Sequence, residues 1–215
     1  MVIYILLLIP VAVIGYAIGS MDTLVLASNF VFHYNLRKLG TGDKWISNFR
    51  RMYGIKGILK LAATELLKNF VPIAIGALLL AIKGHGSVGA AVAGFCLVLG
   101  RLWPVFYSLK GSHASVALIC AGLCMDTSLG AATAIVIIGG LWLTKRISVA
   151  TFLGALAMML VALLVIDEKI IMYLALLTAF AVAVKHIPAV ARAMNGKEPK
   201  LTFSEDLSYK FDEKF

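Results

Sequence analysis

Charged residues are scarce in this chain, and that scarcity excludes most soluble folds. Of its 215 residues, 14% are charged and 61% are hydrophobic, and the mean hydropathy is +0.94. A soluble domain of this composition would expose apolar patches large enough to aggregate, whereas a bilayer about 30 Å thick accepts apolar helices of roughly 20 residues. The composition therefore predicts an all-α integral membrane protein, with no separate globular domain.

Cysteine is also rare, which removes one common kind of metal site. The three cysteines, Cys96, Cys120 and Cys124, lie in apolar stretches with no histidine or carboxylate at ligand spacing. We expect them to pack in the core, and we expect neither a metal site nor another cofactor.

The sequence lacks the marks of a cleaved signal and of a nucleic-acid binder. No basic residue precedes the apolar run that begins at Val2, so we expect this run to be the first span. The net charge of +9 would suit nucleic acid, but the basic residues flank apolar runs and do not line an aromatic-studded surface. We therefore expect the lipid bilayer as a partner and no nucleic acid.

What the sequence does contain is a series of seven apolar runs with short polar links between them. The runs cover residues 2–19, 68–82, 87–109, 115–124, 128–144, 148–166 and 170–185. The fourth run, about ten residues before Asp126, is too short to cross untilted, so it is either extended by His113 and Ala114 or re-entrant. We predict a seven-transmembrane-helix bundle with short interfacial or re-entrant helices.

Lysine and arginine are concentrated in alternate links. Seventeen of the 20 basic residues fall in links that a chain crossing seven times places on one side. Because cytoplasmic links are enriched in Lys and Arg, the alternation predicts an external N-terminus and a cytoplasmic C-terminus in a multi-pass protein of the plasma membrane. It leaves Arg101 as the one basic residue inside a span.

The segment before the second span has the pattern of an interfacial helix. Lys56 and Lys60 alternate with apolar residues, which is typical of a helix that lies at the cytoplasmic surface and turns inward at Phe70. We expect residues 1–196 to form the membrane domain and the polar residues 197–215 to form a cytoplasmic tail.

Three polar segments carry groups that suit a phosphate. In the first, Arg37 precedes Gly40, Thr41 and Gly42. Glycine backbone N–H groups and a guanidinium together hold oxyanions, although the same residues also fit a simple turn with cytoplasmic positive charges.

The other two segments offer less specific signals. Lys110, Gly111, Ser112, His113 and Ser115 lie between two apolar runs. They fit either a phosphate at a helix N-terminus or a serine that caps the next helix. After the last run His186 precedes Arg192, and a lone interfacial histidine is more often a polar anchor.

Five segments together resemble the bacterial acyl-phosphate-dependent glycerol-3-phosphate acyltransferases. They read GS at residues 19–20, NLRKLGTGDKWISN at 35–48, ELLKNFVP at 65–72, GRLWPVFYSLKGSHASVA at 100–117 and KHIPAVARAMNGKE at 185–198. That family has seven helices, an external N-terminus and its conserved loops on the cytoplasmic side, in agreement with the distribution of basic residues.

The resemblance implies transfer of a fatty acyl group from acyl phosphate to the sn-1 hydroxyl of glycerol 3-phosphate, without a covalent enzyme intermediate. It assigns phosphate binding to Arg37, Gly40, Thr41, Gly42, Lys68, Lys110, Gly111, Ser112, His113, Ser115 and Arg192. It implies a catalytic set in which His186 donates a hydrogen bond or relays a proton, while Ser20 and Asn48 help to shape the pocket.

Several positions depart from the family pattern. The Gly-Lys-Gly ending of the second loop is Ser112, His113 and Ala114 here, and a family histidine is replaced by Arg101. A Cβ hinders the approach of backbone to an oxyanion, whereas a guanidinium can replace a lost donor. The preferred interpretation is an acyltransferase. The alternatives are an impaired paralogue that binds lipid or phosphate or regulates a true acyltransferase of the same family, and a small transporter.

Overall fold

The structure is a computed structural model that describes residues 2–23, 45–109, 111 and 113–197. Within these residues it has seven α-helices, one 3₁₀ helix and no strand. The α-helices are α1 (Val2–Ser20), α3 (Trp45–Ala81), α4 (Gly86–Leu102), α5 (Ser115–Met125), α6 (Thr127–Thr144), α7 (Ile147–Val165) and α8 (Lys169–Met194), and the 3₁₀ helix η2 (Val105–Tyr107) follows α4. The predicted all-α class is confirmed.

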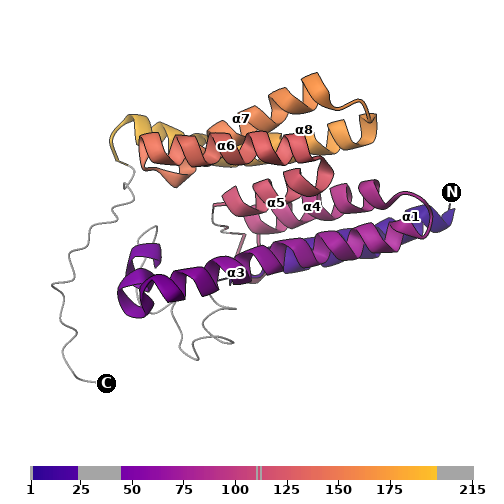
Figure 1. The fold of residues 1–215 in the computed structure, drawn as a ribbon, viewed down its shortest axis with the longest axis horizontal. Helices are drawn as coiled ribbons and strands as arrows, with labels where there is room; N and C mark the ends of the chain where they lie inside the picture. The colour runs from indigo at the N-terminus through magenta and orange to yellow at the C-terminus, as the bar shows by residue number, and fades with distance from the viewer. Residues whose placement is uncertain (1, 24–44, 110, 112, 198–215) are drawn as a thin grey trace.

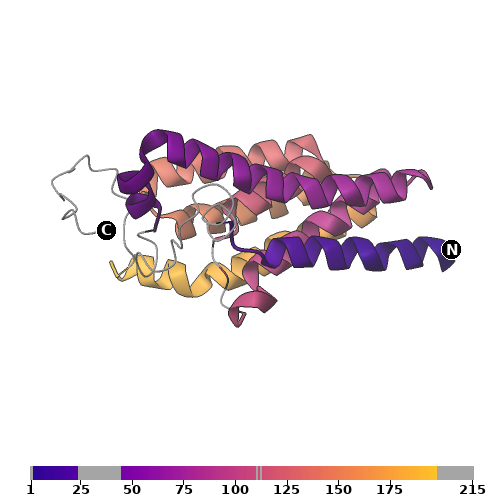
Figure 2. The same cartoon turned by 90° about the horizontal axis from the view of Figure 1, so that it is seen from below.

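Consecutive helices run antiparallel, so alternate links lie at the same end of the bundle (Figures 1 and 2). Helix α4 is central and packs against α1, α3, α5 and α8. We call the end at which α1, α4, α6 and α8 finish, on the left of Figure 1, the Arg101 end, because Arg101 lies in the last turn of α4. The other end, where Asp126 links α5 to α6, is the Asp126 end.

The outward helix faces are apolar and the centre is filled by small residues, as expected in a bilayer. Leu78, Ile135, Trp142 and Leu164 are between 69% and 79% exposed. Alanines of α4 and α8 are buried in the main core, which allows close approach of the helix backbones. Helices α6, α7, α8 and the Leu59–Ala81 part of α3 are long and apolar enough to cross a membrane.

Helix α5 is short, as predicted from the fourth apolar run. It has 11 residues, which at 1.5 Å per residue is about 16 Å, roughly half of the hydrocarbon thickness. Figure 1 shows α5 beginning well inside the left-hand ends of α3 and α6. Ala114, which immediately precedes α5, is therefore buried inside the bundle and does not lie at the level of the left-hand ends of α3 and α6.

The third predicted span was too long at its C-terminal end. Helix α4 stops at Leu102 and the chain continues through Trp103 and Pro104 into η2. Proline disfavours the α conformation in the residue that precedes it, and Trp103, before Pro104, has φ −131° and ψ 70°. The span was predicted to reach residue 109 because the residues up to that point are mostly apolar. Arg101 thus lies at a helix end and not in the middle of a span.

The interfacial helix before the second span was also predicted with the wrong bend. Helix α3 does not turn at Phe70, because its 37 residues are broken only at Gly54, where φ is 63° and ψ is −164°. Glycine adopts a positive φ without a Cβ clash. One continuous helix therefore carries Lys68 from the Arg101 end into the bundle. The last helix, α8, likewise continues past the predicted end at residue 185 to Met194.

Candidate active site

A buried lysine on α3 marks the candidate site. Lys68 is 8% exposed, and its Nζ donates a hydrogen bond of 2.9 Å to the carbonyl oxygen of Met21. Lysine is almost never buried without partners, and this partner lies just beyond the end of α1. Lys68 therefore fastens the segment that follows α1 to the side of α3.

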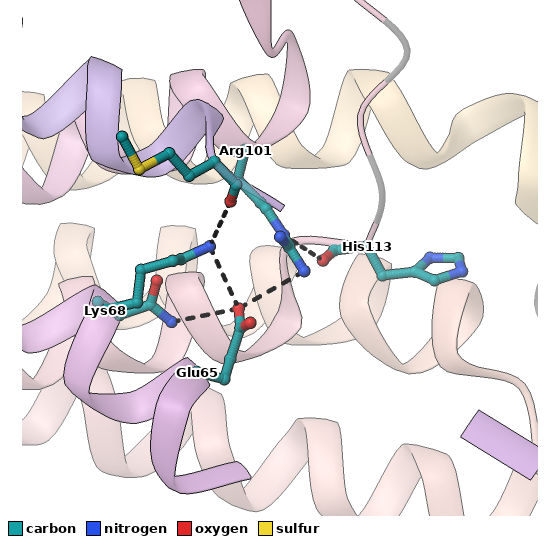
Figure 3. Close-up of polar contacts among 6 residues, drawn as sticks. Glu65, Lys68, Arg101 and His113 are labelled. Carbon is teal, nitrogen blue, oxygen red and sulfur yellow. Dashed lines mark hydrogen bonds and ion pairs between the residues drawn. The ribbon is translucent and has the colours of Figure 1, made fainter. Parts of the chain in front are cut away.

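Glu65 lies one turn before Lys68 and between two cations (Figure 3). Its Oε1 is 3.9 Å from Lys68 Nζ and 3.5 Å from Arg101 Nη2. The Nδ2 group of Asn69 donates to the same oxygen at 3.5 Å. The side chains of Glu65 and Arg101 are only 14% and 12% exposed, so this is a largely desolvated ion cluster that joins α3 to α4.

Arg101 also contacts the segment that leads into α5. Its Nε donates to the carbonyl oxygen of His113 at 3.5 Å, as Figure 3 shows. Two consecutive residues after η2, Ser108 and Leu109, have positive φ values of 53° and 60° and turn the chain back toward α4. A Cβ on Gly111 would collide with the carbonyl oxygens of Arg101 and Leu102, so this close approach requires glycine.

Two histidines lie next to this cluster. The ring centroids of His113 and His186 are 5.8 Å apart, and His113 Nδ1 is hydrogen-bonded to Ser148 Oγ at 3.3 Å. His186 is buried, with Nδ1 2.8 Å from the carbonyl oxygen of Val182. Because a carbonyl only accepts, Nδ1 of His186 carries the proton and Nε2 of the neutral ring is left as an acceptor. This is the state that a proton-accepting histidine needs.

An apolar cavity of about 480 Å³ opens between α1, α4 and η2. It is lined by Ala12, Val13, Tyr16, Ala17, Ser20, Cys96, Val105 and Phe106. Ser20 belongs to this lining: the residue is 2% exposed, and its Oγ has no hydrogen-bond partner among the residues that the structure describes. A buried hydroxyl that is left unpaired costs stability, so Ser20 Oγ is a candidate for a hydrogen bond to a ligand.

The comparison with protein families decides what the chain is related to. A family model described as glycerol-3-phosphate acyltransferase matches residues 9–196. The chain belongs to this family.

Individual relatives cover nearly the whole chain. The glycerol-3-phosphate acyltransferase of Thermoanaerobacter sp. (strain X514) is 25% identical over 88% of this chain and 93% of its own length. Glycerol-3-phosphate acyltransferase 2 of Bacillus anthracis is 27% identical over 88% of this chain and 96% of its own. The glycerol-3-phosphate acyltransferase of Bacillus velezensis is 28% identical, with 88% and 95% covered.

Solved structures of the family share the fold. The crystal structure of PlsY (YgiH), an integral membrane glycerol 3-phosphate acyltransferase, in its glycerol 3-phosphate form has a TM-score of 0.71 to this chain. It is 20% identical, and the match covers 91% of this chain and 96% of that chain. The predicted membrane bundle is thereby confirmed as a fold.

The structure brings together only part of the site that the sequence predicted. Lys68, Arg101, His113 and His186 form one continuous series of contacts through Glu65, with Gly111 packed against Arg101. Ser115 is the first residue of α5 and not its cap, which is Ala114. Arg192 is exposed in the last turn of α8.

Other predicted residues cannot be placed. Arg37, Gly40, Thr41, Gly42, Lys110 and Ser112 lie outside the described residues. Asn48 lies near the start of α3, and its side chain is outside the described part. The grouping of His113 and His186 therefore stands on the structure, while that of the first loop stays a prediction.

Sequence reasoning missed Glu65 and Ser148 as parts of the site. Glu65 stands three residues before Lys68, a spacing that places two side chains on the same helix face and is a usable signal for an ion pair. Ser148 is buried at the start of α7, at the edge of an apolar run, and nothing in its sequence surroundings distinguishes it from a helix-start serine. Within the described residues no group of three His, Cys, Asp or Glu side chains could hold a metal ion.

Proposed function

We propose that this protein is a membrane acyltransferase that moves a fatty acyl group from acyl phosphate to the sn-1 hydroxyl of glycerol 3-phosphate. The hydroxyl oxygen bonds to the acyl carbonyl carbon, the bond from that carbon to the phosphate oxygen breaks, and inorganic phosphate leaves. The family match over residues 9–196 carries the proposal. The product is lysophosphatidate, an early intermediate of phospholipids.

The buried end of the site suits a reaction that depends mainly on orientation. An acyl phosphate is already activated, so holding two phosphates and stabilising the developing oxyanion supplies most of the rate. The polar chain from Lys68 to His186 joins α3, α4, α8 and the approach to α5 at one place. Those elements can position two substrates relative to each other.

His186 is the residue that we assign to the acceptor hydroxyl. Its Nε2 is left as a proton acceptor by the bond between Nδ1 and the Val182 carbonyl. It would take the hydroxyl proton as the new ester bond forms, and the proton would then pass to the departing phosphate. Ser20 and Asn48 are assigned to the walls of the pocket.

The phosphate contacts are assigned to the loops. Arg37 with Gly40, Thr41 and Gly42 would bind glycerol 3-phosphate, and Lys110 with Gly111, Ser112, His113 and Ser115 would bind the donor phosphate. The cap residue of α5 is Ala114, which makes no side-chain cap bond, and the first N–H groups of α5 would be donors for such an anion. Lys68 is assigned a supporting charge, and Arg192 a peripheral one.

The acyl chain of the donor fits the apolar cavity beside α1. The surface that lines the cavity is almost wholly apolar, although Ser20 is among the lining residues. Burial of each methylene among apolar atoms contributes about 0.8 kcal/mol, which favours a lipid chain over a polar ligand there. The acceptor is water-soluble and would enter from the aqueous side.

The charges suggest how the protein lies in the plasma membrane. Lys145, Arg146 and Lys197 lie at the Arg101 end, together with the candidate site. At the Asp126 end, Lys83 and Lys169 are balanced by the acidic residues Asp126, Asp167 and Glu168. Because cytoplasmic links carry more Lys and Arg, we infer that the site faces the cytoplasm and the N-terminus lies outside. Glycerol 3-phosphate is then supplied from the cytoplasm.

A direct assay tests the proposal. Purified protein in detergent is given palmitoyl phosphate and glycerol 3-phosphate, and release of phosphate and formation of lysophosphatidate are measured together. We expect both products in equal amounts. No release above a detergent blank, with a family enzyme active alongside, would contradict the proposal. Retained binding of either substrate without turnover would instead favour the impaired paralogue.

A further inference from the structure

We infer that Glu65 is a positioning residue that holds two described segments in register: the residues that follow α1, at Met21, and the residues that precede α5, at His113. This inference rests on the proposed function, and it gives a role to Glu65, to which the sequence alone assigned none. Glu65 acts through two cations, Lys68 and Arg101, each of which donates a hydrogen bond to a backbone carbonyl in a different segment of the chain (Figure 3).

The first arm runs through Lys68. Its Nζ donates to the carbonyl oxygen of Met21 at 2.9 Å, at the point where the chain leaves α1. Glu65 Oε1, 3.9 Å from this Nζ, supplies the opposite charge that keeps the ammonium in a site where the side chain is 4% exposed. Asp22 also acts on the Lys68 charge, so Glu65 is one of two acids on this arm.

The second arm runs through Arg101. Its Nη2 is 3.5 Å from the same Glu65 oxygen, and its Nε donates to the His113 carbonyl at 3.5 Å. His113 in turn faces His186 and bonds Ser148. The single oxygen of Glu65 is therefore shared by the group that holds the chain after α1 and the group that holds the chain before α5.

Removal of the carboxylate charge should release both arms together. Lys68 and Arg101 both approach Glu65 Oε1 and would be left as two neighbouring cations in a poorly solvated place. Repulsion between the two cations would push Lys68 away from the Met21 carbonyl and Arg101 away from the His113 carbonyl. A shift of about 1 Å in reacting groups is enough to cost roughly 100-fold in rate.

The pattern of effects across three variants distinguishes this role from a general loss of stability. Lys68→Met breaks the arm to Met21 alone, Arg101→Gln breaks the arm to His113 alone, and Glu65→Gln breaks both. Hydrogen–deuterium exchange in detergent reports the backbone directly. We expect faster exchange around Met21 in the first variant, around His113 in the second, and at both places in Glu65→Gln.

Kinetics give the second readout. For Glu65→Gln we expect the KM values for palmitoyl phosphate and for glycerol 3-phosphate to rise together, with kcat/KM reduced by about 100-fold. Glu65→Asp keeps the charge but shortens the side chain, so it should recover part of the loss. Glu168→Gln, an exposed acid at the Asp126 end, is the matched control and should leave both readouts unchanged.

The outcomes separate this inference from the proposed function. If Glu65→Gln or Glu65→Asp alters exchange around only one of the two positions, or lowers the melting temperature with KM values unchanged, the shared-anchor role is wrong. If wild-type protein shows no acyl transfer yet Glu65→Gln loosens both positions and Glu65→Asp does not, the anchor stands and the proposed function fails.

Discussion

The two ends of the bundle handle polar groups in opposite ways. At the Asp126 end the polar residues are exposed or satisfied locally: Asp126 accepts from the Ser128 backbone N–H at 2.7 Å and also from the Ser128 hydroxyl. At the Arg101 end Lys68 and His186 are buried, and Ser20 Oγ lacks a partner among the described residues.

This difference separates residues that end helices from residues that await a ligand. A helix cap stabilises the folded protein, because it satisfies N–H groups that would otherwise be unpaired. A buried hydroxyl without a partner and a buried ion cluster are costly in the free protein, and such costs are retained mainly at functional sites. The comparison therefore predicts that substitutions at the Arg101 end affect activity, and those at the Asp126 end affect stability alone.

The largest effect is expected at His186. Replacement by alanine removes the proposed proton acceptor, and kcat should fall by about 100- to 10,000-fold in the palmitoyl phosphate assay. The matched control is His85→Ala, which removes an exposed histidine before α4 at the Asp126 end. Equal losses in the two variants would mean that the ends do not differ as proposed.

Ser20 should show activity and stability moving in opposite directions. Ser20→Ala removes a buried hydroxyl that lacks a partner among the described residues, so the melting temperature in detergent should stay the same or rise. If the hydroxyl meets a substrate phosphate, kcat/KM should fall by about 10- to 100-fold. Ser128→Ala is the control at the other end, where the hydroxyl bonds Asp126. There the melting temperature should fall and kcat/KM should not; the reverse would refute the comparison.

Cys96 tests whether the apolar cavity holds the acyl chain. Cys96→Phe adds bulk to the wall and should displace one or two methylenes of a long chain, at about 0.8 kcal/mol each. The ratio of kcat/KM for palmitoyl phosphate over lauroyl phosphate should then fall by roughly 4- to 15-fold. Cys96→Ala adds no bulk and should keep the wild-type ratio. An unchanged ratio in the phenylalanine variant would place the chain elsewhere.

The smallest effect is expected at Asp126, and it should be seen in stability alone. Asp126→Ala removes the cap of α6 and should lower the unfolding free energy by about 1 kcal/mol with kcat unchanged. Hydrogen bonds from the Ser128 hydroxyl and backbone lower the pKa of Asp126 below its ordinary 3.8. Its ionised form thus stabilises the fold at neutral pH, and that contribution is lost as the pH falls below 3.8 through the lowered pKa.

Asp126→Asn separates the cap from the charge. Asparagine caps a helix about as well as aspartate, so melting at neutral pH should stay close to wild type. The acid-dependent part of the stability should disappear, which melting curves between pH 2 and pH 7 would reveal. A wild-type pH dependence in this variant would assign the acid sensitivity to another group.

Much of the fold was accessible from sequence because each helix in a bilayer must carry its own apolar run. The order of the helices and the shortness of α5 followed from run lengths. The errors arose where backbone geometry overrides composition. Pro104 ends α4 before the apolar residues stop, and Gly54 is the point where α3 bends although Phe70 had been expected.

The site was only partly predictable, for a different physical reason. Lys68, Arg101 and His186 were named from the sequence because their residue types suit phosphate chemistry and because the family resemblance pointed to Lys68 and His186. The groups that Lys68, Arg101 and His186 contact include the backbone carbonyls of Met21, His113 and Val182. Every residue carries such a carbonyl, so no sequence pattern marks the ones that become partners. Glu65 was not named as a site residue because its contact with Arg101, far away in the sequence, is visible only in the structure.

The shortness of α5 has a consequence for how a lipid and a water-soluble molecule can meet. A full-length helix at that position would keep polar surroundings at the level of the headgroups, and a fatty donor would have to lift its reactive carbonyl toward them. Because α5 has only 11 residues, the polar groups before it can lie deeper in the membrane than the headgroups. The hydrocarbon tail of the donor can then stay buried among apolar side chains, where each methylene contributes about 0.8 kcal/mol of binding free energy. The water-soluble acceptor would enter the protein to that depth.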